Sequence, residues 1–169
     1  LGSGLAISGD WAMVGSIAQG ARRGATYAFK RSGNNWVQHQ KLDLPEDNVQ
    51  GDSFGGAIAL NGAQALVTAT GKDEGQGAVY AVSDDAGTDM WVAAGRLQSP
   101  PLEARAGMGA SMVIRDGTAL VAAAGYMQGM GVVFEYTMTE DGWQLGSLLS
   151  PLSLCCCRCA VVVFFVVVV

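Results

Sequence analysis

The charged and aromatic side chains that could contact a ligand lie in short polar segments between apolar runs. Three such segments, 16–23, 70–76 and 124–130, hold the candidate contact residues Arg22, Arg23, Lys72, Asp73, Glu74 and Tyr126. Guanidinium, phenol and carboxylate groups on a rigid scaffold are typical of protein or glycan contacts. Exposed, solvated loops contain the same groups, so the sequence leaves both interpretations open.

No arrangement of these residues indicates catalysis. His39 is the only histidine, and it lies between two glutamines without a cysteine nearby, so it has no nucleophile to activate. Asp73 and Glu74 are adjacent, whereas glycosidase carboxylates need a defined separation across a cleft. The glycines at 75 and 77 precede an apolar, strand-like segment and not a helix, so they do not fit a nucleotide-binding loop. We therefore expect no enzymatic activity and assign no catalytic residue.

The composition favours an all-β protein that does not bind nucleic acid. The chain has 169 residues, of which half are hydrophobic and 24 are glycine. Abundant glycine with alternating apolar residues indicates short strands joined by tight turns. The formal charge is -5, and the binding of nucleic acid requires clustered Lys and Arg to replace counterions. Solubility alone can account for the acidity.

Three markers recur along the chain at one spacing. The glycine before the third apolar run of each unit, the valine that closes the second run and a tryptophan all repeat at steps of 52 to 55 residues. They are Gly24, Gly77 and Gly131; Val14, Val67 and Val121; and Trp36, Trp91 and Trp143. A period of this length is typical of solenoids, propellers and arrays. We predict three units, 1–53, 54–107 and 108–150.

Each unit is predicted to form four short strands. The first two strands of the units are expected at 5–7 and 12–14, 58–60 and 65–67, and 112–114 and 119–121. Asn61-Gly62 and Asp116-Gly117 between them are typical of two-residue hairpin turns. After a loop of seven or eight residues comes a third strand with alternating aromatics, and then a fourth strand that opens with the tryptophan. A leucine follows each tryptophan by six residues, and this even offset predicts that both face the same side.

Four-stranded sheets of this kind must stack to bury two apolar faces. Radial stacking gives a β-propeller, with each unit as one blade. A β-sandwich is the alternative, but it does not explain the period. The identical placement of the three tryptophans favours packing between blades over a row for stacking sugars. Because closed propellers have about four to eight blades, we expect an open arc or part of a larger propeller.

One family shares this pattern. The segments GDSFGGAIALNGAQALV and GAVYAV, followed by a Trp and a Leu, resemble the FG-GAP repeat, the blade unit of the integrin alpha-subunit propeller. The resemblance is stronger to the bacterial and protist branch. It covers about residues 1–150, with Phe54-Gly55 matching the FG pair outright. Leu1-Gly2 and Met108-Gly109 match it with another apolar residue, and none of the three copies has the proline of GAP.

The resemblance implies an extracellular or cell-surface binding scaffold, but it does not extend to calcium. Many relatives carry a D-x-D-x-D-G loop, and calcium requires several such oxygen ligands. The turns here, SGDWA, NGAQA and RDGTA, hold at most one aspartate each. We therefore predict no metal site and no cofactor.

The last segment, 151–169, departs from the repeat. It holds all four cysteines and ends in an apolar run of eleven residues, below the roughly 20 that a membrane-spanning helix needs. A truncated membrane anchor with acylated cysteines and a low-complexity artefact are both open interpretations. Contiguous cysteines lack the spacing of a zinc site. The chain begins at Leu without a signal peptide, so we expect a fragment or a processed chain.

Three functional hypotheses follow from these observations. The first is a non-enzymatic surface module for binding or adhesion, with a protein or glycan ligand and with membrane contact only through 151–169. The second is part of a propeller glycosidase or lyase whose active site lies in other blades. The third is a structural spacer without a ligand.

Overall fold

Three four-stranded sheets make up the described part of the protein. The structure is a computed structural model that describes residues 1–42, 49–85 and 87–150. The first sheet, blade 1, contains β1 (Leu5–Ser8), β2 (Trp11–Ser16), β3 (Ala25–Ser32) and β4 (Asn35–Leu42). Blade 2 contains β5 (Phe54–Asn61), β6 (Gln64–Ala69), β7 (Ala78–Asp85) and β8 (Met90–Arg96). Blade 3 contains β9 (Met108–Arg115), β10 (Thr118–Ala123), β11 (Val132–Thr139) and β12 (Gly142–Leu149).

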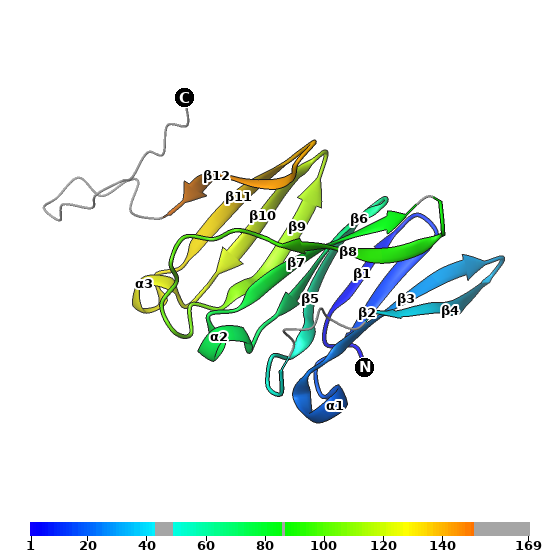
Figure 1. Cartoon of the computed structure of the whole chain (residues 1–169), viewed down its shortest axis with the longest axis horizontal. Helices are drawn as coiled ribbons and strands as arrows, with labels where there is room; N and C mark the ends of the chain where they lie inside the picture. Colours follow the sequence, from blue (N-terminus) through cyan, green and yellow to red (C-terminus); the bar gives the residue numbers. More distant parts are fainter. Residues whose placement is uncertain (43–48, 86, 151–169) are drawn as a thin grey trace, which may run out of the picture.

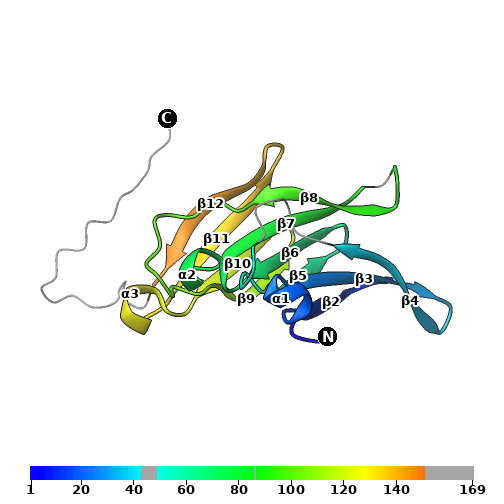
Figure 2. The ribbon, with the colours of Figure 1, turned by 60° about the horizontal axis from the view of Figure 1, so that its bottom comes forward.

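The three sheets stack as the blades of an incomplete propeller. Within each sheet, every strand pairs antiparallel with the next strand in the sequence, so each blade is a meander (Figure 1). The first strands β1, β5 and β9 lie side by side, whereas the fourth strands diverge (Figure 2). This arrangement confirms the all-β class and the four-stranded blades predicted from the repeat. The segment 151–169, where an anchor or an artefact was considered, lies outside the described residues.

Two hydrophobic clusters fill the junctions between blades. At junction 1–2, Met13 and Ala28 of blade 1 pack against Tyr80, Val82 and other residues of blade 2. At junction 2–3, alternate residues of blade 2 pack against blade 3. Because side chains alternate across a strand, β7 contributes to both clusters and the sheet is buried on both faces. Blade 2 is therefore the centre of the described fold.

The prediction that each tryptophan and the leucine six residues later share a face is wrong. Trp91 lies at junction 1–2, whereas Leu97 lies at junction 2–3. The register between β7 and β8 shifts between Ala81 and Val82, because the fourth strand carries one extra residue there. Such a bulge places two consecutive residues opposite one, which reverses the parity of everything beyond it. Blades 1 and 3 have the same shift between their third and fourth strands.

The repeated glycines allow one blade to seat against the next. A Cβ built on Gly77 would lie 2.8 Å from the amide nitrogen of Met108 and still closer to the carbonyl oxygen of that residue. Gly24 meets the backbone of Phe54 in the same way, and a parallel bridge joins the two residues. Among the described residues no blade follows blade 3, and the nearest neighbour of a Cβ on Gly131 would be 3.6 Å away. The repeated glycine of one blade and the FG position of the next blade thus form the two sides of one backbone contact.

Each loop after a second strand contains a single turn that the sequence did not predict. These turns are α1 (Gln19–Arg22), α2 (Lys72–Gly75) and α3 (Tyr126–Gly129). The second and third residues of each turn have left-handed backbone angles, with φ between 50° and 60°. Non-glycine residues rarely adopt this conformation, but it recurs in all three blades. The turn is therefore a structural feature that each blade repeats.

Candidate functional site

Five of the six candidate contact residues lie on the three turns, and Arg23 directly follows α1. The turns are all at one end of the blades (Figure 1). Lys72 is buried, and its Nζ lies 3.1 Å from Oδ2 of the buried Asp52. Asp52 also accepts a hydrogen bond from the backbone nitrogen of Val49. This lysine therefore holds the connection before blade 2 against α2 and does not extend into solvent.

Two further candidates also have structural contacts. Asp73 Oδ2 lies 2.8 Å from a guanidinium nitrogen of Arg96, which joins α2 to the last strand of its own blade. Tyr126 packs edge to face on Phe134, with the ring centroids 6.4 Å apart, at the margin of the cluster at junction 2–3. Edge-to-face pairs of this kind stabilise the core itself.

The side chains of Arg22, Arg23 and Glu74 are exposed, as a contact site requires. Their backbone carbonyls accept hydrogen bonds from the start of the next blade, including 2.9 Å from Phe54 N to Arg23 O and 3.3 Å from Arg105 N to Glu74 O. The loops therefore position successive blades. Asp73 is exposed as well, but its carboxylate is paired with Arg96. The role of Arg22, Arg23 and Glu74 as ligand contacts stays a prediction.

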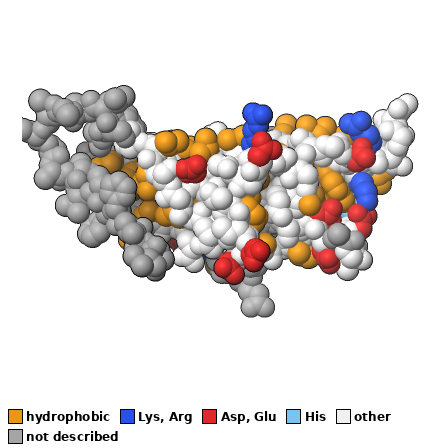
Figure 3. Space-filling model, turned by 90° about the horizontal axis from the view of Figure 1, so that it is seen from above, with side chains coloured by type: hydrophobic (Ala, Val, Ile, Leu, Met, Phe, Trp, Pro, Cys, Tyr) orange, Lys and Arg blue, Asp and Glu red, His pale blue; other side chains and the backbone are white. Residues whose placement is uncertain are grey.

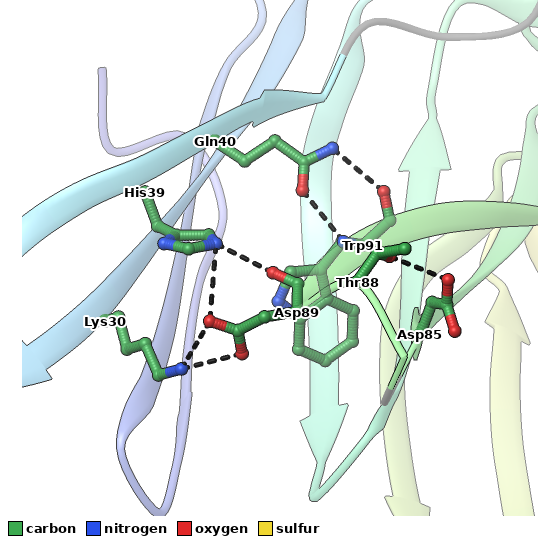
Figure 4. Close-up of polar contacts among 7 residues, drawn as sticks. All are labelled: Lys30, His39, Gln40, Asp85, Thr88, Asp89 and Trp91. Carbon is green, nitrogen blue, oxygen red and sulfur yellow. Dashed lines mark hydrogen bonds and ion pairs between the residues drawn. The ribbon is translucent and has the colours of Figure 1, made fainter.

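A polar cluster that sequence reasoning missed lies at the opposite end of junction 1–2 (Figure 4). Lys30 Nζ of blade 1 lies 2.6 Å from Asp89 Oδ2 of blade 2, and His39 Nε2 lies 2.7 Å from the carbonyl oxygen of Asp89. The Gln40 amide pairs with both backbone groups of Trp91, at 2.8 and 2.9 Å. We call this set of five residues the rim clamp. It fastens the β3–β4 hairpin of blade 1 to the β7–β8 turn of blade 2.

Aromatic contacts close the inner side of the rim clamp. The ring of Trp11 packs edge to face on Trp91 at 5.5 Å, and the Lys30 ammonium lies 5.0 Å from the centre of the Trp11 ring. A cation over an indole face is attracted by the ring quadrupole. The ammonium of Lys30 is therefore held by both a carboxylate and an aromatic ring.

Acidification should loosen the rim clamp. The hydrogen bond from Lys30 lowers the pKa of Asp89, so the folded state favours its carboxylate. This contribution is present above the ordinary aspartate pKa of about 3.9 and is lost as pH falls through the lower folded value. Urea unfolding from neutral to strongly acidic pH should show Asp89→Asn less stable than wild type at neutral pH and equal to it in acid. The exposed Asp116→Asn is the control, and a constant gap across the pH range would contradict the prediction.

Junction 2–3 has a cleft at the place that corresponds to the rim clamp. Strand register makes Gln64, Ser83 and Ala94 of blade 2 equivalent to Trp11, Lys30 and His39 of blade 1. These smaller side chains leave a space of about 340 Å³, which we call the rim cleft. Binding sites for small molecules or side chains occupy clefts of this order. At junction 2–3, blade 2 therefore lacks the side chains that blade 1 contributes to the rim clamp.

The blade 3 half of the clamp is retained in the rim cleft. Asp141 and Trp143 line it, and they correspond to Asp89 and Trp91 of the clamp. Glu140 adds a second carboxylate. The indole nitrogen of Trp143 is buried and has no hydrogen-bond partner among the described residues. The cleft thus keeps an acidic, aromatic wall and lacks the lysine that faces such a wall at junction 1–2. An alignment of the units would have revealed this difference, because it places Ser83 of blade 2 at the position of Lys30 in blade 1.

Other kinds of site have less support in the described part of the chain. Within residues 1–42, 49–85 and 87–150, no three His, Cys, Asp or Glu side chains are grouped so that they could hold a metal ion. Over the same residues, no helix has the length and apolar character needed to cross a membrane.

One known protein family matches a part of the chain. The FG-GAP repeat family matches residues 36–82, which run from β4 of blade 1 through β5 and β6 into β7 of blade 2. The matched segment contains the FG pair at Phe54-Gly55. Phe54 is also the blade 2 residue that contacts Gly24, which lies before the matched segment. No curated protein matches the chain.

Proposed function

From the FG-GAP repeat that this chain contains, we propose that it is a non-catalytic binding module of an extracellular or cell-surface protein. FG-GAP repeats are typical of such proteins, and the rigid stack of blades is suited to presenting loops and clefts. The contact site is the rim cleft between blades 2 and 3. Its ligand is a basic side chain of a protein partner, and adhesion through such a partner is the cellular role.

The rim clamp is the observation that carries this proposal. It contains an intramolecular example of the contact, in which Lys30 lies against Asp89 with Trp11 beneath the ammonium. The rim cleft keeps the matching carboxylate, Asp141, but has Ser83 in place of the lysine. A lysine or arginine from a partner can therefore occupy the position that Lys30 occupies one junction earlier. Hydrogen bonds to charged groups contribute more than neutral ones, which favours a cationic ligand.

The surface around the cleft supports a protein partner over nucleic acid. On the face drawn in Figure 3, the basic side chains lie in separate places, each beside an acidic side chain. A continuous basic surface would be needed to neutralise phosphates. Glu140 and Asp141 are adjacent on one turn and do not flank a scissile bond as glycosidase carboxylates do. This geometry supports binding without catalysis.

The test measures binding of a labelled pentalysine peptide by fluorescence anisotropy. Asp141→Asn should weaken binding about tenfold, the loss expected for one charge-assisted hydrogen bond. Ser83→Lys should abolish binding, because the new ammonium would take the place of the ligand as Lys30 does at junction 1–2. Asp116→Asn, which removes an exposed carboxylate elsewhere, should bind as wild type does.

Two outcomes would overturn the assignment. A fully acetylated pentalysine peptide that bound equally well would show that the cation is not recognised. Unchanged binding to the Ser83→Lys variant would place the contact outside the cleft. A glycan array with the same three variants checks the alternative ligand class: glycan binding that depends on Asp141 would replace the basic side chain as ligand.

A further inference from the structure

The side-chain amide of Gln40 shows how the edge of a fourth strand is satisfied at junction 1–2 (Figure 4). Gln40 Nε2 donates to the carbonyl oxygen of Trp91 over 2.9 Å, and the backbone N–H of Trp91 donates to Gln40 Oε1 over 2.8 Å. Asp84, the cross-strand neighbour of Trp91, directs its own N–H to Ala63 on the other side of β7. This pair therefore has no ladder hydrogen bonds, and the backbone groups of Trp91 point out of the sheet edge.

Trp143 occupies the same position in blade 3 but lacks such a partner. Its cross-strand neighbour Met138 directs its N–H to the carbonyl oxygen of Gly117, 2.8 Å away, so the N–H and C=O of Trp143 also point out of the sheet edge. Trp143 lines the rim cleft and is only 8% exposed. Within the part of the chain that the structure describes, neither backbone group has a hydrogen-bond partner. Buried backbone groups are normally paired, so the cleft offers a donor and an acceptor to a ligand.

Gly95 explains why the partner is missing. The strand register places Gln40 opposite Ala28 in blade 1 and Gly95 opposite Ala81 in blade 2, so Gly95 stands where the amide side chain would begin. Gly95 also lines the rim cleft, and a Cβ built on it would meet no atom within 4 Å. The space that the Gln40 side chain fills at junction 1–2 is therefore open at junction 2–3.

A primary carboxamide matches the two free backbone groups of Trp143 best. It carries a donor and an acceptor side by side, as the contact of Gln40 demonstrates. A carboxylate only accepts hydrogen bonds and would face Glu140 and Asp141, while an ammonium only donates them. A strand of a partner could pair its main chain with both groups, but the equivalent contact inside this chain is made by a side chain.

We propose that the rim cleft binds a carboxamide side chain together with the basic side chain, through the backbone N–H and C=O of Trp143. This second contact lies in the same cleft and so rests on the proposed function. Lys30 and Gln40 are diagonal neighbours on adjacent strands, which puts them about 7–8 Å apart. Residues two apart in an extended peptide lie on one side at about the same separation. The ligand is thus an extended segment in which one residue separates a Lys or Arg from a Gln.

The first test compares two peptides of equal charge by fluorescence anisotropy. Lys-Ala-Gln-Ala-Lys places a lysine two residues from the glutamine in both directions, and Lys-Ala-Ala-Ala-Lys is its control. Each carries a fluorophore at its amino end and an N-methylamide at its carboxyl end, so glutamine supplies the only primary carboxamide. The glutamine peptide should bind the full chain about tenfold more tightly, as expected for two added hydrogen bonds. A peptide with N,N-dimethylated glutamine keeps the acceptor but loses the donor, and it should bind no more tightly than the alanine control.

The second test locates the carboxamide in the cleft. In NMR spectra of the nitrogen-labelled chain, the backbone amide proton of Trp143 should shift downfield with the glutamine peptide but not with the alanine peptide. Gly95→Gln should remove the preference for the glutamine peptide, because the chain would then supply its own amide to Trp143. Gly95→Ala is the matched control and should keep the preference, since both variants share the positive φ of 114° but only one adds an amide.

The results separate the carboxamide contact from the proposed function. Equal affinity for the glutamine and alanine peptides, with binding still dependent on Asp141, would overturn the carboxamide contact and leave the site for a basic side chain in place. Water would then satisfy the backbone of Trp143. No binding of these peptides or of pentalysine would overturn both proposals. A preference for glutamine that leaves the Trp143 amide proton unshifted, or that survives in Gly95→Gln, would place the carboxamide elsewhere and overturn its assignment to Trp143.

Discussion

Gly77→Ala should destabilise the chain by about 2–5 kcal/mol, whereas Gly131→Ala should cost only about 1–2 kcal/mol. Both glycines have a positive φ, 79° and 75° respectively, so the backbone strain of a Cβ is common to the two variants. Only at Gly77 would that Cβ also collide with the backbone of Met108 in the next blade. The difference between the variants therefore isolates the close approach of one blade to another.

Urea unfolding monitored by tryptophan fluorescence measures this difference. Gly24→Ala provides a repeat of the experiment, since its Cβ would meet Phe54 in the same way. Equal losses at positions 77 and 131 would mean that backbone strain alone explains the repeated glycine.

Lys72→Tyr alone should destabilise blade 2 by about 3–5 kcal/mol, whereas the double variant Asp52→Ala/Lys72→Tyr should regain most of that loss. The single change leaves the carboxylate of Asp52 buried without its cation. The double change installs the residues that blade 3 has at the two equivalent positions, Ala106 and Tyr126. Well-packed apolar residues can replace a buried ion pair with little loss.

A double-mutant cycle by urea unfolding tests this expectation. Asp52→Ala alone should also be destabilising, because it leaves Lys72 without this partner and removes the bond to Val49 N. A positive coupling between the two positions is expected. Additive losses in the double variant would show that the ion pair contributes nothing beyond its separate residues. Arg115→Ala, in an exposed ion pair with Asp116, is the control and should cost at most about 1 kcal/mol.

Much of the fold could be predicted because it depends on local patterns. Alternating apolar residues and Asn-Gly or Asp-Gly turns determine short antiparallel strands, and the recurrence of the glycine, valine and tryptophan determines three equal units. A four-stranded sheet with two apolar faces has to be covered on both, which leads to stacking. The residue ranges predicted for the first and second strands of each unit accordingly lie within the strands of the structure.

The candidate contact residues were less predictable, because burial is a tertiary property. Lys72 and Glu74 are two residues apart on one polar turn, yet one is buried beside Asp52 and the other is exposed. Tyr126 looks like a ligand contact in the sequence but packs on Phe134. Whether a charged loop residue points inward depends on the connection from the preceding blade. For Lys72, the residue of that connection that pairs with it is Asp52, which lies 20 residues earlier in the sequence.

The sequence by itself determined the repeat, the strands and the residue types at each blade position, because these follow from periodicity along the chain. The tertiary structure alone decided which face each residue occupies beyond the bulge in the fourth strand. The one extra residue there places Trp91 and Leu97 on opposite faces of the sheet. It also decided that Lys30 meets Asp89, while Ser83 leaves a cleft beside Asp141. Contacts between blades join residues far apart in the sequence, from 30 positions for Gly24 and Phe54 to 59 for Lys30 and Asp89, and no local pattern encodes the space between them.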